Sequence, residues 1–433
     1  MSNSHNNGPA PEPVGPAGKE KTQGFATRAV HAGAQVPDDG TRPANVPIYA
    51  SSTFLSADAQ SLDDVLGGTR AGYVYARYGN PTVTALENAV NALEGAAATV
   101  AFGSGMAALH AALLLCELEP GSVVLAGTDL YGASHTLLAT LLGQFDVRTR
   151  FVDVTDHEAF AQALQETPTP RAALFETVSN PLMKVADLPY LCAQARAAGT
   201  LTVVDSTFTP PPLAQPLAHG ADIVIHSATK YFGGHGDVVG GLVSVADPAR
   251  EATLRQISKL AGSVLGPFEA FLINRGVKTL TVRLRQQCEN AAALAEWLEA
   301  HPGIERVYYP GLAGHPQHEV ANKVLRQPYP GAMLAFSIAG AEQADIFALF
   351  DALKLVLPAT TLGDVYTEVS YPMMSSHREW SPAQRRRSGI TPGLVRVSVG
   401  IEDIEDIIED FRQAFSRLDV LAGASTQGQS QIA

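Results

Sequence analysis

Short apolar runs alternate with stretches of helical periodicity from about residue 74 to residue 266. The apolar runs have the length of buried strands, whereas the stretches between them repeat apolar residues three and four positions apart, as an amphipathic helix does. This alternation is typical of helices packed on a mainly parallel sheet. The predicted strands lie at 99–102 and 123–126 and around Phe151, Leu174, Val203 and Ile225, and the first predicted helices at 82–93 and 106–118.

The pattern changes after residue 267, where long helical stretches such as 279–300 precede apolar strands at 332–338 and 394–399. This order predicts a second, smaller α+β domain. The two ends of the chain are rich in small and polar residues and lack the apolar periodicity that stabilises a fold. We therefore expect an α/β protein made of a disordered tail at 1–22, an N-terminal arm at 23–73, a large domain at 74–266, a small C-terminal domain at 267–420 and a second disordered tail at 421–433.

Composition and charge narrow the class of protein. The 433 residues are 46% hydrophobic and 17% charged, which is enough for one large core and a smaller second one. A formal net charge of -13 argues against a nucleic-acid partner, because phosphates would be repelled. The longest apolar stretch, 107–118, is too short to span a bilayer, so no membrane partner is expected. Three widely spaced cysteines without a CxxC pair indicate neither a disulfide framework nor a metal site, and we expect a cytoplasmic protein.

Two of the predicted strands in the large domain end on reactive side chains. The run 201–205 ends on Asp205, and the next run leads through Ser227 and Thr229 to Lys230. Because parallel strands end at the edge where open α/β sheets bind ligands, we expect these side chains to lie close together. A lysine amine can hold the aldehyde of pyridoxal phosphate as a Schiff base, and a carboxylate keeps its ring nitrogen protonated. The sequence therefore predicts a pyridoxal-phosphate site in the large domain, with two hydroxyls available to the phosphate.

Two further signals are weaker when taken alone. A glycine-rich turn follows one strand and opens an alanine-rich helix, so the backbone N–H groups of Gly105 and Met106 would face an anion. Such turns are common, and this one indicates a phosphate site only together with Ser227 and Thr229. Tyr131 starts the helix after another strand, and its ring would lie against a flat cofactor or, alternatively, be half-buried in the core.

Five motifs together carry a family resemblance. They are Tyr75-Ala-Arg77-Tyr-Gly-Asn80-Pro81-Thr82, Gly103-Ser104-Gly105-Met106, Asp205-Ser-Thr-Phe208, Ser227-Ala-Thr229-Lys230-Tyr231 and Leu394-Val-Arg396-Val-Ser-Val-Gly400. In this order they resemble the trans-sulfuration family of pyridoxal-phosphate enzymes, which includes cystathionine γ-synthase, cystathionine γ-lyase, methionine γ-lyase and O-acetylhomoserine sulfhydrylase. The resemblance runs from about Thr27 to Leu418 and implies the fold of the fold-type I pyridoxal-phosphate transferases.

The resemblance also implies a role for each matching residue. Lys230 and Tyr131 are expected to be catalytic, while Arg396 and Thr361 are expected to bind substrate. Arg396 would grip the substrate carboxylate, the alternative being a structural ion pair with a core acid. A homotetramer with shared sites is implied as well. The residues expected to bind the cofactor are Lys230, Asp205, Tyr131, Gly105, Met106, Ser227, Thr229 and Asn180, joined by Tyr75 and Arg77 from a neighbouring subunit.

Some positions depart from the family pattern. Members that process cystathionine usually carry acids, which help to hold the distal amino group of the substrate, where this chain has Val74 and Tyr366. Asp364 or Glu368 would compensate for these missing charges by holding the distal ammonium. Typical methionine γ-lyases carry a cysteine where this chain has Ala133. The distal part of the substrate is therefore left open by the sequence.

The reaction expected first is γ-elimination. A pyridoxal-phosphate-dependent lyase of the cystathionine or methionine γ-lyase type would convert a sulfur-containing amino acid to a 2-oxo acid, ammonia and a thiol. The alternative is a γ-replacement transferase, such as cystathionine γ-synthase or O-acetylhomoserine sulfhydrylase. A cofactor-binding regulator without catalysis is disfavoured, because Lys230 and Arg396 are both present.

Overall fold

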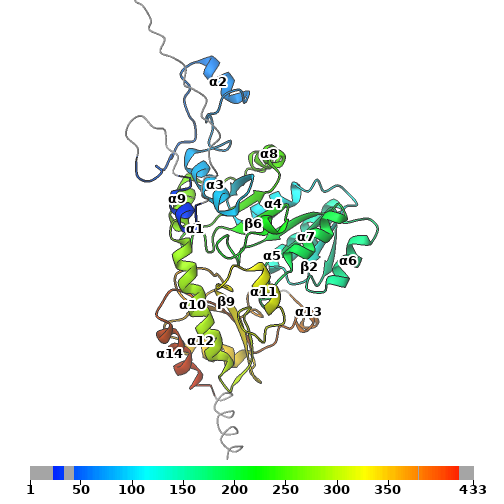
Figure 1. Cartoon of the computed structure of the whole chain (residues 1–433), viewed down its shortest axis with the longest axis vertical. Helices are drawn as coiled ribbons and strands as arrows, with labels where there is room; N and C mark the ends of the chain where they lie inside the picture. Colours follow the sequence, from blue (N-terminus) through cyan, green and yellow to red (C-terminus); the bar gives the residue numbers. More distant parts are fainter. Residues whose placement is uncertain (1–22, 34–42, 379, 419–433) are drawn as a thin grey trace, which may run out of the picture.

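The computed structural model describes residues 23–33, 43–378 and 380–418 of the chain. The expected disordered tails at 1–22 and 421–433 lie outside the described residues. Figure 1 shows two sheets arranged along the long axis of the molecule, with the long helix α10 (Leu280–Glu299) running beside the second. This arrangement confirms the expected α/β fold with a larger, mainly parallel sheet.

The larger sheet has seven strands in the order β1-β7-β6-β5-β4-β2-β3. Six of them run in the same direction, whereas β7 runs antiparallel to both of its neighbours. Nearly every residue of these strands is buried except in the edge strand β3, which explains why the other strands appear in the sequence as continuous apolar runs. The strands are β1 (Ala98–Phe102), β2 (Val123–Gly127), β3 (Arg148–Val152), β4 (Ala172–Glu176), β5 (Leu201–Asp205), β6 (Ile223–Ser227) and β7 (Gly241–Val245).

Helices cover both faces of this sheet, and each face has its own apolar core. One face packs against α3 (Pro81–Glu94), α6 (His157–Gln165), α7 (Leu188–Ala197) and α9 (Pro267–Val277). The other packs against α4 (Gly105–Leu114) and α8 (Glu251–Ala261).

Helix α4 begins at the edge of the sheet and is shorter than its periodicity predicts. The Ser104 side chain caps it by accepting a hydrogen bond from the Ala107 N–H, at 3.1 Å. The helix ends at Leu114 rather than at residue 118. Glu117 adopts a left-handed conformation with φ of 53°, and Pro120 follows it, so the chain leaves the helix early despite its apolar residues.

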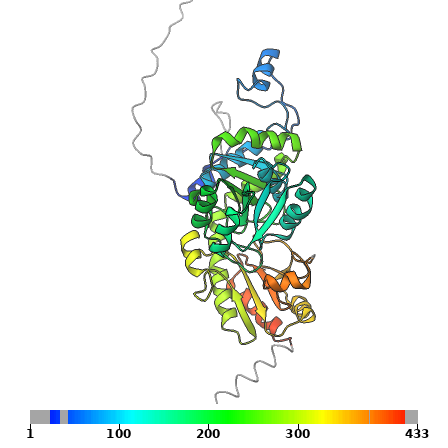
Figure 2. The same cartoon turned by 90° about the vertical axis from the view of Figure 1, so that its right-hand side faces the viewer.

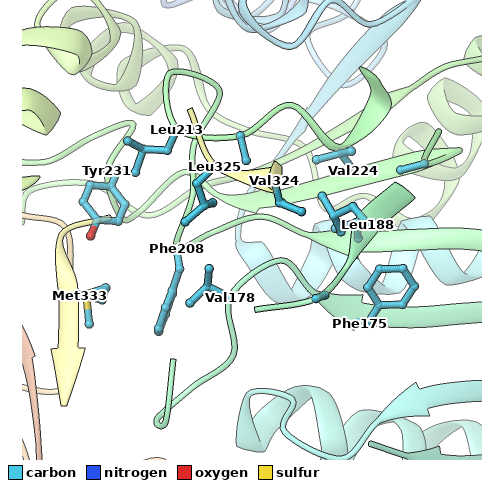
Figure 3. Close-up of a cluster of buried hydrophobic side chains, with 14 of the residues drawn as sticks. Phe175, Val178, Leu188, Phe208, Leu213, Val224, Tyr231, Val324, Leu325 and Met333 are labelled. Atoms are coloured by element: carbon cyan, nitrogen blue, oxygen red, sulfur yellow. The ribbon is translucent and has the colours of Figure 1, made fainter. Parts of the chain in front are cut away.

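The second sheet has five strands in the order β10-β11-β12-β9-β8. One of its faces packs against α10, α12 (Gln343–Ala352) and α14 (Ile404–Phe415). The other face turns toward the larger sheet, and Met333 and Leu394 belong to the same core as Phe208 and Tyr231. Figure 3 shows Met333, Phe208 and Tyr231 in this core. The strands are β8 (Ile304–Tyr308), β9 (Met333–Ile338), β10 (Leu357–Pro358), β11 (Glu368–Ser370) and β12 (Leu394–Ser398).

The chain before α3 forms an arm that carries α1 (Phe25–His31) and α2 (Ala59–Leu66). Figures 1 and 2 both show α2 standing off from the two sheets. The arm exposes apolar side chains, among them Leu55 at 96% and Leu66 at 57%. The short helices α5 (Gly132–Thr136), α11 (His318–Val324) and α13 (Pro382–Arg387) complete the fold.

The division of the chain into an arm, a large domain and a small domain, with boundaries at residues 23, 74, 267 and 420, remains a prediction.

Three properties of the described residues bear on function class. None of their helices has the length and apolarity needed to cross a membrane. They contain no group of three His, Cys, Asp or Glu side chains placed to hold a metal ion. Cys116, Cys192 and Cys288 are buried free thiols.

Candidate active site

A cavity of about 250 Å³ lies at the carboxyl edge of the larger sheet. Strands β4, β5 and β6 end there on Glu176, Asp205 and Ser227. The start of α4, Arg396 of the second sheet and the loop between its strands β10 and β11 complete the wall, so the sheet edge gathers most of the residues that the sequence singled out. Of the predicted site residues, the lining includes Gly105, Met106, Tyr131, Asn180, Asp205, Ser227, Thr229, Lys230 and Arg396.

Lys230 follows β6 in a turn held by backbone hydrogen bonds. The Ala228 N–H donates to the Gly240 carbonyl at 2.9 Å, and the Lys230 carbonyl accepts from the Gly234 N–H at 2.8 Å. The Lys230 Nζ donates to Thr361 Oγ1 at 2.9 Å. Burial, and next the positive charge of Arg396, lower the pKa of this amine. The turn thus presents an amine that loses its proton more readily than an exposed lysine does.

Asp205 is the last residue of β5, and its Oδ1 accepts a hydrogen bond from the Thr207 N–H at 2.9 Å. Burial raises the pKa of this carboxyl. A cation in the cavity would oppose that shift and hold Asp205 ionised, because an opposite charge favours the charged form. Asp205 is therefore suited to a protonated ring nitrogen.

Glu176 is a site residue that the sequence reading missed. It ends β4 directly beside Asp205 of β5. Its Oε1 accepts from the Tyr131 N–H at 2.7 Å, and its Oε2 accepts from the Asn180 N–H at 3.2 Å. Burial and the neighbouring Asp205 raise its pKa well above the ordinary value. One carboxyl group thereby fixes the backbone of two predicted cofactor residues, and the 46% exposed Tyr131 ring stands at the cavity rim.

The start of α4 and the end of β6 approach each other closely. A Cβ on Gly105 would lie 2.8 Å from the Ser227 Cβ, so only glycine fits there without a shift. The first N–H groups of a helix have no partners within it, and those of Gly105 and Met106 open toward the cavity wall. The Thr229 hydroxyl is anchored by accepting from the Gly240 N–H at 3.1 Å. Hydroxyls and helix N–H groups together form a cradle for an anion.

Arg396 extends from β12 to the opposite wall and is only 5% exposed. Its Nη1 donates to Asn180 Oδ1 at 3.0 Å, and its Nη2 donates to the Thr361 carbonyl at 3.1 Å. Its buried Nε has no hydrogen-bond partner among the described residues. No carboxylate in the described part of the chain lies within 4.0 Å as an ion-pair partner, and burial lowers the pKa of this guanidinium to about 10. A buried cation with neutral partners is suited to an incoming anion.

The remaining predicted residues, Thr361, Tyr75 and Arg77, are not part of the cavity lining, although Thr361 contacts it. Thr361 bridges the two cations, since its hydroxyl accepts from Lys230 and its carbonyl from Arg396. Tyr75 and Arg77 do not reach the cavity within one chain. Tyr75 is 42% exposed, and Arg77 Nη1 donates to the Lys259 carbonyl in α8 at 2.7 Å.

The side chains around the cavity fit pyridoxal phosphate group by group. The Lys230 amine suits the aldehyde, the Asp205 carboxylate suits the ring nitrogen, and the cradle beside Gly105 suits the phosphate. The Arg396 guanidinium is left over for a second anion, such as an amino-acid carboxylate. This donor set can therefore hold the cofactor and an amino acid at once.

Known proteins resemble this chain over nearly its whole length. The family described as Cys/Met metabolism PLP-dependent enzyme matches residues 26–416. L-methionine gamma-lyase of Fusobacterium nucleatum subsp. polymorphum is 40% identical over 403 residues, covering 92% of this chain and 99% of that protein. Cystathionine gamma-lyase of Bacillus subtilis is 40% identical over 392 residues, covering 90% and 99%. The crystal structure of cystathionine gamma synthase from Xanthomonas oryzae pv. oryzae in complex with cystathionine superimposes with a TM-score of 0.86 at 37% identity, covering 94% of this chain and 100% of that one.

Proposed function

Because this chain belongs to the Cys/Met metabolism PLP-dependent enzymes, we propose that it is a γ-eliminating lyase. It would convert a sulfur-containing amino acid to a 2-oxo acid, ammonia and a thiol. The alternative within the family is γ-replacement, in which a thiol takes the place of the γ-substituent, and its support is the similarity to a cystathionine gamma synthase.

Bound pyridoxal phosphate supplies an electron sink for the charge that develops at the substrate α-carbon. In our proposal the Lys230 Nζ removes the α-proton, and Thr361 Oγ1, at 2.9 Å from it, orients the amine. Such a placed base typically contributes about 10²–10⁴-fold to a rate. Arg396 binds the α-carboxylate, and Tyr131 gives a proton to the leaving sulfur at the cavity rim. Asp205 maintains the positive charge of the ring nitrogen.

The observation that favours elimination is the single guanidinium in the cavity. Among the described lining residues, Arg396 is the only arginine and Lys230 the only lysine. Replacement by an amino-acid thiol would bring a second carboxylate into this space, whereas elimination from an amino acid with an uncharged thioether tail, such as methionine, requires only one. Much of the remaining wall is apolar and suits a thioether tail. These apolar residues are Met106, Leu109, Val178, Phe208, Ile225, Val239 and Leu362.

The test is a substrate panel with two readouts. Methionine, cystathionine, homocysteine, O-acetylhomoserine and O-succinylhomoserine are each incubated with the cofactor-loaded enzyme, with and without an added thiol. We expect 2-oxo acid from a sulfur amino acid in both conditions, and none from the Lys230→Ala enzyme. A new thioether as the main product, formed only when the thiol is present, would instead assign γ-replacement.

We also propose a homotetramer in the cytoplasm. Tyr75 and Arg77 do not reach the cavity of their own chain, and the arm that precedes them exposes apolar residues such as Leu55. A neighbouring copy would cover this surface and receive both side chains at its own phosphate cradle. The buried free thiols are in keeping with a reducing compartment.

A further inference from the structure

Glu368 and Arg396 lie on the same face of the second sheet. Glu368 of β11 pairs with Ser398 of β12, and Ser370 pairs with Arg396. Residues between them, such as Val369, point to the opposite face and join the core under α10. Diagonal neighbours on one face are about 7–8 Å apart, which long side chains can bridge. Glu368 and Arg396 are such neighbours, and both face the larger sheet.

The Glu368 carboxyl is withdrawn from water without a matching partner. The residue is 2% exposed, and its buried Oε2 has no hydrogen-bond partner among the described residues. In the described part of the chain, no Lys, Arg or His nitrogen lies within 4.0 Å of the Glu368 carboxyl as an ion-pair partner. Burial, and next the neighbouring Asp364, raise its pKa to about 7. Glu368 therefore changes protonation state with little energetic cost near neutral pH.

Charged groups surround Glu368 from several elements. Arg396 of β12 and Lys230 of the turn after β6 favour its ionised form, whereas Asp364 and Glu402 oppose it. The Tyr231 hydroxyl is also buried there and has no hydrogen-bond partner in the described part of the chain. The effect is mutual, because among the charges around Arg396 the carboxylate of Glu368 does most to raise the pKa of the guanidinium.

A carboxylate arriving at Arg396 disturbs this balance. The field of one guanidinium would then act on two carboxylates, that of the substrate and that of Glu368 on the same sheet face, and two like charges disfavour each other's ionised form. Since Glu368 is buried, has no hydrogen-bond partner for its Oε2 among the described residues and has a raised pKa, it is the carboxylate that takes up a proton.

We propose that Glu368 is a proton-linked counter-charge of Arg396, ionised when no substrate carboxylate is bound and protonated, by a proton from solvent, when one binds. This role rests on the proposed function, in which Arg396 holds an amino-acid carboxylate. Glu368 is thus a positioning residue that sets the pH range over which Arg396 accepts its substrate.

Because protonation of Glu368 is coupled to substrate binding, the direction in which the substrate Kd changes with pH can be predicted. Well below pH 7 Glu368 is already protonated, so substrate binding takes up no proton there. Above that range wild-type binding must take up the proton, and its Kd weakens by about tenfold per pH unit relative to a variant that lacks the acid. The ratio of wild-type Kd to Glu368→Gln Kd should therefore rise with pH, while ionisations common to both proteins cancel.

The experiment uses cofactor-loaded enzyme and L-norvaline, an amino acid without a leaving group on its γ-carbon. Its binding is titrated through the cofactor's visible absorption from about pH 6 to about pH 8.5. We expect the Kd ratio to rise by about tenfold or more across this range. Calorimetry at the alkaline end in two buffers of different ionisation enthalpy should show more proton uptake by wild type than by Glu368→Gln. The control is Glu305→Gln, an exposed acid on β8 of the same sheet, for which the ratio should stay flat.

The outcomes separate the two proposals. A flat Kd ratio for Glu368→Gln, with L-norvaline still bound, overturns the role of Glu368 and leaves the proposed function intact. Failure of wild type to bind L-norvaline at any pH overturns the premise, taken from the proposed function, that Arg396 holds an amino-acid carboxylate. Glu368→Leu, which removes the acid without adding an amide, should reproduce the rising ratio, and it serves as the test if the glutamine variant loses its cofactor spectrum.

Discussion

Arg396→Lys is the perturbation whose effect the structure specifies most fully. The guanidinium donates to Asn180 and to the Thr361 carbonyl from its two terminal nitrogens, so its plane is fixed before substrate arrives. A lysine ammonium is a single point charge without this planar fork. The substitution keeps a cation at the site and removes the geometry that binds a carboxylate with two hydrogen bonds.

The expected size follows from the loss of one charged hydrogen bond, about 1.5–3 kcal/mol. Since 1.36 kcal/mol corresponds to a factor of ten, the KM for the amino-acid substrate should rise by about 10- to 150-fold. The kcat should change much less, because Lys230 and Tyr131 keep their places. A rise in KM at constant kcat is the signature of lost uniform binding.

The assay is steady-state release of 2-oxo acid, with visible absorption and circular dichroism recorded for each protein. The matched control is Arg412→Lys on the exposed surface of α14, where the side chain is 57% exposed and no change in KM is expected. Unfolding or cofactor loss in the Arg396 variant, with an unchanged KM for the remaining active fraction, would refute the reasoning and make Arg396 structural.

Three further predictions concern the cradle, the assembly and the pH dependence of stability. Gly105→Ala should weaken cofactor binding while the fold survives, because the new Cβ would lie 2.8 Å from the Ser227 Cβ. Gly143→Ala is the control, because Gly143 has open space around it and its substitution should leave cofactor affinity unchanged. Equal cofactor affinities of the two variants by titration would contradict this prediction. Mixing inactive Lys230→Ala and Arg77→Ala chains should restore part of the activity by forming hybrid sites, and a mixture that stays inactive despite subunit exchange, shown by mass spectrometry, would argue against shared sites. Burial lowers the pKa of His315 from 6.5 to about 4, so the unfolded chain binds a proton more readily. The chemical denaturation midpoint should therefore fall as pH drops through that range, and His315→Gln should reduce the slope.

The sequence predicts the sheet edge well because reactive side chains end apolar runs there. Lys230 and Asp205 stand out for that reason, and the structure places both at one cavity. Glu176 ends its strand in the same way, but a glutamate after an apolar run is ordinary until the pairing of β4 with β5 sets it beside Asp205. What the sequence lacks is the register between strands.

Register also explains why the relation between Glu368 and Arg396 was not predicted. The sequence reading named Glu368 only as a compensating acid for a distal ammonium. The two residues become neighbours through the antiparallel pairing of β11 with β12, which is fixed by tertiary packing rather than by local pattern. The early end of α4 has a similar origin, since the backbone conformation of Glu117 outweighs apolar periodicity.

The most direct test of the central claim, γ-elimination, is the identity of the 2-oxo acid released from L-cystathionine. The molecule can be cleaved on either side of its sulfur, and each cleavage leaves a different carbon skeleton. Elimination at the γ-carbon gives 2-oxobutanoate and cysteine, whereas elimination at the β-carbon gives pyruvate and homocysteine. We predict 2-oxobutanoate with an equal amount of ammonia, in the absence of any added thiol. Pyruvate as the main product, or turnover only when a thiol is supplied, would contradict the account.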